Sequence, residues 1–145
     1  MELYLREKYN YSNFEAVICD IRNYERMEFI FKSYHPDVVY HAAAYKHVPV
    51  MESNPSESVI TNVLGTKITA DLSVKYNVEK FVMISTDKAV NPTNIMGASK
   101  RIAEIYIQSL NRKSTTSFIT TRFGNVLDSN GSVIPRFRKQ IEEGR

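Results

Sequence analysis

Short apolar runs bounded by polar residues recur along the chain. They read "EAVICD" (15–20), "DVVYHAAA" (37–44), "KFVMIST" (80–86) and "SFITTRFG" (117–124). Each run has the length of a buried strand and is rich in β-branched or aromatic residues. The pattern therefore predicts four strands.

Helical spacing fills the gaps between these runs. The apolar positions that mark it are Met27, Ile30, Phe31 and Tyr34, then Leu64, Ile68 and Leu72, then Ile102, Ile105 and Tyr106. The first series stops at His35-Pro36, where proline blocks a helix, and the last predicts a helix over about 94–111. Alternating strands and helices predict an α/β fold: a Rossmann-like parallel sheet of about four strands with helices on both faces.

Composition narrows the class of protein. The 145 residues are 43% apolar and 24% charged, which suits one globular domain. A net charge of only +3 and the absence of a basic stripe argue against a nucleic-acid partner. No apolar stretch approaches the roughly 20 residues of a membrane helix. The single cysteine, Cys19, fits a reduced, cytoplasmic setting.

The positions of the glycines show that the chain has no glycine-rich nucleotide-binding turn. The five glycines include no G-x-G-x-x-G or Walker A spacing. A dinucleotide-binding fold normally holds its pyrophosphate on a glycine-rich turn after the first strand. We therefore interpret residues 1–145 as a partial NAD(P)-binding Rossmann core, truncated at both ends.

Polar clusters follow each predicted strand. They are 20–22, 42–47, 85–88 and 122–125. The carboxyl ends of parallel strands meet at one edge of a sheet, where ligands bind. Any one cluster could be an ordinary solvated loop, but their coincidence predicts a functional site at that edge.

Five segments carry a family resemblance. They are "DIRN", "PDVVYHAAAYKHVPVME", "NPSESVITNVLGT", "STDKAVNPTNIMGASKR" and "RFGNVLDSNGSVIPRF". Together they resemble the CapD-like polysaccharide-biosynthesis branch of the extended short-chain dehydrogenase/reductases, which are nucleotide-sugar 4,6-dehydratases acting mainly on UDP-N-acetylglucosamine. The resemblance implies an NAD or NADP cofactor, a UDP-N-acetyl sugar substrate and, in longer relatives, membrane helices outside this region.

The resemblance also implies a reaction. The sugar is oxidised at C4, water is lost across C5–C6, and the hydride returns to C6, so that this lyase causes no net redox change. Carried over, Lys88 removes the C5 proton and Asp87 protonates the C6 oxygen. A lysine base must be neutral although its free pKa is about 10.4, and an aspartic acid donor needs a pKa raised by desolvation. Without the resemblance, Asp87-Lys88 would read as a surface ion pair.

Met96 and Lys100 lie four residues apart, on one helix face. The wider superfamily places a tyrosine at the position of Met96, whose phenol removes the C4 hydroxyl proton. A thioether has no proton to exchange, so the role passes to Ser85, Thr86, Asp87 or a bound water. Lys100 is expected to hold the nicotinamide ribose. Met96 could equally serve only as core packing.

The remaining site residues follow from the resemblance. Expected cofactor contacts are Asp20, Ile21, Ala42, Ala43, Ala44, Asn62, Ser85, Lys100 and Phe123. Expected substrate contacts are Lys46, His47, Asn125, Val133, Ile134, Pro135 and Arg136. The spacing of His47 from His35 and His41 indicates no metal site.

Two alternatives remain open. The first is a nucleotide-sugar epimerase or reductase, which the adjacent acid and base disfavour. The second is a non-catalytic fragment that forms a homo-oligomer or pairs with a complementing chain through an unpaired sheet edge. Because the glycine-rich turn is missing, we expect the isolated chain to bind NAD weakly and to turn over slowly or not at all.

Overall fold

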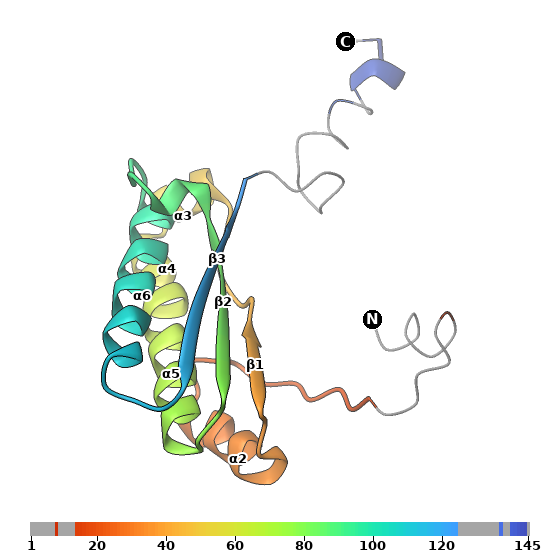
Figure 1. Ribbon diagram of the computed structural model, residues 1–145. Coiled ribbons are helices and arrows are strands. Elements are labelled where there is room, and N and C mark those ends of the chain that lie inside the picture. Colours follow the sequence, from red (N-terminus) through yellow and green to blue (C-terminus); the bar gives the residue numbers. More distant parts are fainter. Residues whose placement is uncertain (1–7, 9–13, 125–136, 138–139, 145) are drawn as a thin grey trace.

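The computed structural model describes residues 8, 14–124, 137 and 140–144 (Figure 1). In chain order its elements are α2 (Tyr24–Tyr34), β1 (Val38–His41), α3 (Val48–Ser53), α4 (Pro55–Val59), the π-helix η1 (Ile60–Gly65), α5 (Thr66–Lys75), β2 (Lys80–Thr86), the 3-10 turn η2 (Asp87–Ala89), α6 (Ile95–Asn111) and β3 (Ser117–Phe123). The alternation of strand and helix confirms the α/β class.

The strands form one parallel sheet in the order β1-β2-β3. The described residues thus contain three strands rather than about four. The predicted strand at 15–20 is extended but joins no ladder, and Ile18 within it is 96% exposed. A strand needs a hydrogen-bonded neighbour, and the described residues offer none beside this segment.

Helices α5 and α6 cover one face of the sheet, and α2 packs against α5 (Figure 1). Phe81, Met83 and Phe118 from the sheet meet Ala103 and Ile107 of α6 in one core cluster. A second cluster joins α2 to α5 through Met27, Phe31, Ile68 and Leu72.

Among the described residues, helices cover only this one face, although the sequence predicted helices on both. Tyr40 is 74% exposed and Ile119 is 41% exposed on the opposite face. Parallel sheets are normally buried on both faces, so this apolar surface is unusual for the class.

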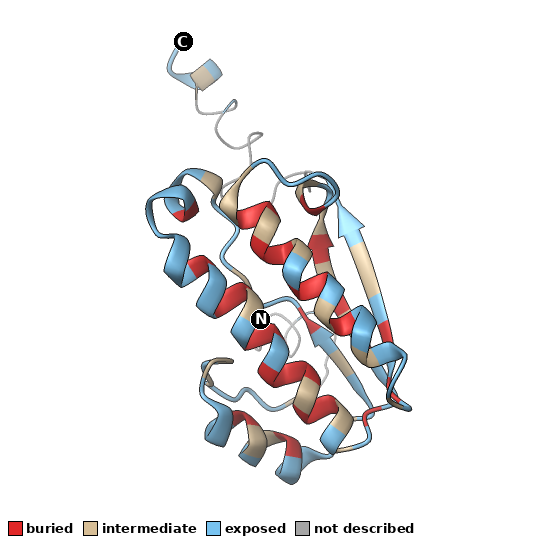
Figure 2. Ribbon diagram, turned by 90° about the vertical axis from the view of Figure 1, so that its left-hand side faces the viewer, coloured by how far each residue is buried: buried red, intermediate tan, exposed pale blue. Residues whose placement is uncertain are grey.

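Helices α4, η1 and α5 run as one rod beside α6 (Figure 2). The π-helical stretch widens the turn, and Leu64, expected on the buried face with Ile68 and Leu72, is exposed instead.

The expected face of α6 is only partly buried, because Tyr106 packs against the core but the two isoleucines do not. Ile102 and Ile105 point to solvent, whereas Lys100, Ala103, Glu104 and Ile107 are buried. The polarity of this buried face hid it from a search for apolar periodicity.

Candidate functional site

The carboxyl end of β2 leads directly into the turn η2, which carries Asp87 and Lys88. The Thr86 hydroxyl accepts a hydrogen bond from the backbone N–H of Lys88 and so caps the turn. Helix α6 begins a few residues later, where the Asn94 side chain accepts the backbone N–H of Gly97 at 2.8 Å. The catalytic candidates therefore lie on a capped turn and in the capped helix that follows it.

Asp87 and Lys88 form an ion pair. Asp87 Oδ1 accepts hydrogen bonds from Thr86 Oγ1 at 2.8 Å, from the Lys88 backbone N–H at 2.9 Å and from Lys88 Nζ at 3.1 Å. The Thr86 hydroxyl, followed by Lys88, lowers the pKa of Asp87, which burial opposes only weakly. This direction is opposite to the raised pKa that an aspartic acid donor needs, because the carboxylate is open to water and has three donors.

Lys100 is 4% exposed and lies under the same turn. Its Nζ donates a 2.7 Å hydrogen bond to the Ile84 carbonyl oxygen on β2. Burial lowers the pKa of Lys100 to about 8, and the nearby Glu104 carboxylate opposes this shift. Met96, one helical turn earlier, is 4% exposed and packed in the interior. The geometry therefore gives Met96 a packing position.

Asn62 is fully buried in the π-helix and holds the segment that follows β1. Its side chain accepts the Tyr45 backbone N–H at 2.8 Å and donates to the Tyr45 carbonyl oxygen at 3.0 Å. It also donates to Ser99 Oγ on α6 at 3.0 Å. One amide therefore ties the loop after β1 to the helix that carries Lys100.

The other expected cofactor residues lie at or near this edge. Ala42 and Ala43 are exposed and Ala44 is half-buried directly after β1, so their backbone is open to a ligand. The Asp20 carboxylate is bound by the Arg22 guanidinium, and Arg22 reaches on to Glu57 of α4 at 3.1 Å. Ile21 packs against Gly65 of η1, where a side chain at position 65 would collide with it. Phe123 ends β3 and is 47% exposed.

A hollow of about 300 Å³ lies beside the loop after β1. It is lined by Tyr45, Lys46, His47, Val50, Met51, Asn54 and Glu57. Both substrate-contact candidates of this loop, Lys46 and His47, line the same hollow, which makes it the candidate sugar site.

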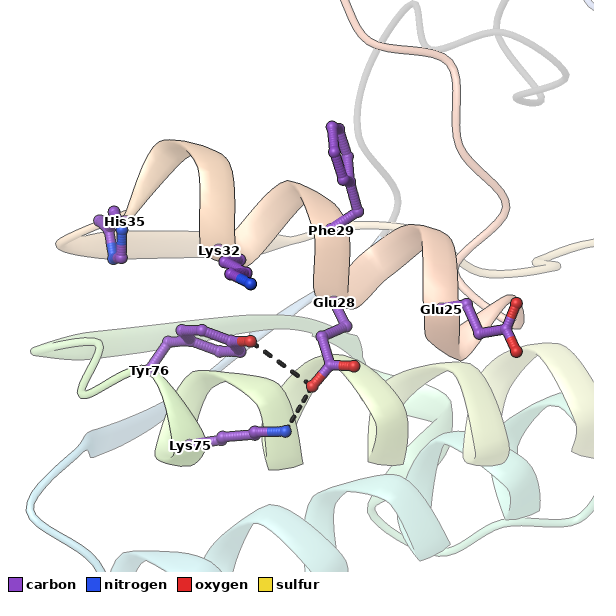
Figure 3. Close-up of a pocket in the computed structure, with 7 residues that line it drawn as sticks. All are labelled: Glu25, Glu28, Phe29, Lys32, His35, Lys75 and Tyr76. Carbon is purple, nitrogen blue, oxygen red and sulfur yellow. Dashed lines mark hydrogen bonds and ion pairs between the residues drawn. The ribbon is translucent and has the colours of Figure 1, made fainter.

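A larger hollow of about 670 Å³ lies between α2 and the end of α5 (Figure 3). The Glu28 carboxylate on its wall is bound by Lys75 and Tyr76. His35 and Tyr76 in its lining precede the amino ends of β1 and β2, so this hollow lies at the edge of the sheet away from Asp87.

Two buried polar groups near the site escaped the sequence-based search. His41 is 3% exposed, and its Nε2 lies 2.8 Å from Thr66 Oγ1. Burial, aided by the charge of Lys100, lowers the pKa of His41 to about 4. The second is Glu104, which is bound by Arg122. The sequence does indicate that Glu104 lies near the site, because it follows Lys100 by four residues and so shares its helix face.

The candidates Asn125, Val133, Ile134, Pro135 and Arg136 lie outside the described residues. Within the described part of the chain, no three His, Cys, Asp or Glu side chains gather as metal ligands. No helix in that part is long and apolar enough to cross a membrane.

Solved structures define the class of protein. The fold matches Pen from Bacillus thuringiensis with a TM-score of 0.85 and 40% identity, over 98% of this chain and 46% of that one. It also matches WbmG from Bordetella bronchiseptica, solved in complex with NAD, with a TM-score of 0.80 at 22% identity over 93% of this chain and 46% of that one. The chain thus shares the Rossmann-type fold of these structures.

The family follows from the sequence. The profile of the family described as "Polysaccharide biosynthesis protein" matches residues 1–145, and the chain belongs to this family. It is 57% identical over 136 residues to the capsular polysaccharide biosynthesis protein CapD of Staphylococcus aureus, covering 93% of this chain and 23% of that protein.

Two further relatives have named activities. The UDP-N-acetylglucosamine 4,6-dehydratase (inverting) of Campylobacter jejuni is 42% identical over 88% of this chain and 38% of its own length. The UDP-glucose 4-epimerase of Rickettsia canadensis is 43% identical over the same shares. The chain therefore spans only about a fifth to two fifths of these relatives.

Proposed function

We propose that the chain carries the catalytic turn of a UDP-N-acetylglucosamine 4,6-dehydratase that serves surface polysaccharide synthesis. The observation that carries this proposal is the adjacent Asp87-Lys88 pair on a capped turn at the carboxyl end of β2, with Lys100 buried beneath it. An elimination across C5–C6 needs such a neighbouring acid and base. The single free cysteine, Cys19, agrees with a cytoplasmic enzyme.

The dyad needs a drier environment than the open turn provides. Lys88 would take the C5 proton from the sugar, and Asp87 would protonate the departing C6 oxygen. Asp87 now favours its charged form. A sugar seated over the turn would displace water from the carboxylate and raise its pKa, which is the direction that an acid requires.

Thr86 is the best candidate for the C4 hydroxyl proton. Ser85 is 6% exposed and its side chain lies inside the fold, with no hydrogen-bond partner of normal geometry among the described residues. The Thr86 hydroxyl instead already donates to Asp87 at 2.8 Å. A proton taken from the sugar by Thr86 could therefore pass to the Asp87 carboxylate.

The residues fit a dinucleotide at this edge. The exposed backbone of Ala42 and Ala43 gives room for close approach, and Lys100 would hold the nicotinamide ribose. Bound NAD or NADP supplies the hydride acceptor for oxidation at C4 and the donor for its return to C6. Lys46 and His47, which line the 300 Å³ hollow, would contact the sugar or its phosphates.

The test is incubation of the purified chain with UDP-N-acetylglucosamine and NAD, followed by mass spectrometry of the sugar nucleotide. A product lighter by one water, lost in Lys88→Ala and kept in the exposed-residue control Lys113→Ala, would support the proposal. A 4-epimerase, the alternative favoured by the Rickettsia relative, would leave the mass unchanged and alter the configuration at C4.

An unchanged substrate would favour a non-catalytic fragment or a chain that needs a complementing partner. Fusing a glycine-rich strand-turn-helix to the amino end of the chain separates these two outcomes. Turnover restored by that segment would fit our expectation that NAD binds weakly without a glycine-rich turn. Continued inactivity would overturn the dehydratase assignment.

A further inference from the structure

An ion pair between the buried Glu104 and the partly exposed Arg122 joins helix α6 to strand β3. Glu104 is fully buried, and its two carboxylate oxygens accept parallel hydrogen bonds from Arg122 Nε at 2.9 Å and Arg122 Nη2 at 2.7 Å. Arg101 adds a third bond at 3.1 Å. Burial opposes the charged carboxylate, but the hydrogen bonds from these guanidinium groups hold the pKa of Glu104 below its ordinary value.

Stability alone does not account for a carboxylate at this position. The neighbours on the buried face of α6 are Ala103 and Ile107, which pack against Phe81 and Phe118. Replacing a buried ion pair by apolar side chains of similar size is often neutral or stabilising, because the charges no longer lose their hydration. The buried Glu104 carboxylate is better explained here by the geometry that its hydrogen bonds with Arg122 impose on the end of β3.

That geometry concerns the candidate site. In the sheet register, Ser85 lies beside Arg122, and Thr86 lies beside Phe123. Arg122 is therefore bound to α6 one residue before β3 ends beside the turn that carries Asp87. Gly124 follows, and a side chain there would lie 4.0 Å from Asp87 Oδ2. Lys100, one helical turn before Glu104, reaches the Ile84 carbonyl on β2. One face of α6 thus holds the ends of two adjacent strands.

We propose that Glu104 is a positioning residue: its two parallel hydrogen bonds with Arg122 fix the carboxyl end of β3 beside the turn that carries Asp87. The pair holds Phe123 and Gly124 at a set distance from Asp87 and Lys88. Calling this edge a catalytic site rests on the proposed function. The positional effect itself does not, because it is measured without turnover.

The experiment compares the wild-type chain with the double variant Glu104→Met/Arg122→Met. Unfolding in urea gives global stability, and residue-resolved amide hydrogen exchange by NMR gives local stability. We expect global stability to be kept while exchange of those amides of 121–123 that are hydrogen-bonded to β2 rises roughly tenfold, since hydrogen bonds to charged groups contribute locally. Exchange at 118–120, in the same strand, should not change.

The control is Lys67→Met/Asp71→Met, which removes a partly exposed ion pair on α5 with the same change in charge, together with the hydrogen bond from Tyr106 of α6 to Asp71. It should leave 121–123 unaffected. The single variant Glu104→Gln keeps the shape and one acceptor, and should give a smaller rise at the same amides if the double variant fails to fold. Unaltered exchange at the strand end in these variants, or a uniform rise along β3, would overturn the proposal. A failed dehydratase assay would leave it standing.

Discussion

Gly97 lies directly against the backbone of Lys88. A Cβ atom at position 97 would collide with the Lys88 carbonyl oxygen and come within 3.1 Å of its carbonyl carbon. Contacts to backbone atoms cannot be relieved by rotating a side chain. The first turn of α6 and the turn that carries the acid-base dyad are therefore packed at the closest distance that the chain permits.

We predict that Gly97→Ala displaces Lys88 and lowers the rate of the proposed dehydratase reaction by about a hundredfold, the loss typical of a misplacement of about 1 Å. Helix propensity alone would favour alanine by about 1 kcal/mol, so a loss of activity cannot be a failure to form the helix. Steady-state kinetics and the amide chemical shift of Lys88 measure the effect. Gln108→Ala, at an exposed position of the same helix, is the matched control and should change neither.

The elements that could be predicted are those whose signals are local. Strand β2 has the predicted bounds 80–86, because an apolar run ends at a polar turn. Helix α6 begins one residue after the predicted start, where Asn94 is the cap. The segment 15–20 carried the same local signal but forms no strand, since pairing depends on a neighbour that the local sequence does not specify.

The sheet edge at which the candidate residues lie follows from the sequence, whereas their electrostatics do not. The loops after β1 and β2 meet at one edge as the parallel topology requires. The lowered pKa of Asp87, however, depends on three donors and an open surface that only the fold brings together. Glu104 was missed because the buried face of α6 that carries it is partly polar, so apolar periodicity selected another face.

Lys100 should lower the free energy of unfolding at neutral pH. Its pKa is about 8 in the folded chain and about 10.5 when unperturbed, so the unfolded chain holds more protons between these values. The free energy of unfolding should therefore rise as pH increases from 8 to 10.5. Lys100→Met should remove this slope and, at pH 7, stabilise the chain by about 1–2 kcal/mol while abolishing activity. Urea unfolding measures this, with Lys113→Met as the exposed control. A destabilised Lys100→Met would contradict it.

His41 should make the chain sensitive to mild acid. Its pKa is about 4 in the fold against 6.5 when free, because burial and the charge of Lys100 disfavour the imidazolium. The unfolded state therefore binds more protons between pH 6.5 and 4, and stability falls as pH falls through that range, by about 3 kcal/mol. His41→Gln removes this contribution. The difference between the two unfolding curves isolates it from the carboxylates, and parallel curves would show that His41 titrates normally.

A charge introduced on the exposed face of α6 should have little effect on stability, whereas a charge on its buried face should destabilise the chain. Ile102 is 50% exposed, whereas Ile107 is fully buried in the core with Phe81 and Phe118. A lysine at position 102 can extend into water, so Ile102→Lys should change the free energy of unfolding by less than about 0.5 kcal/mol. Ile107→Lys places an unpaired charge in the core and should destabilise by at least about 3 kcal/mol or prevent folding. Urea unfolding measures both variants, with Ile105→Lys as a second exposed position. If apolar periodicity were the better guide, Ile102→Lys and Ile105→Lys would be the destabilising variants.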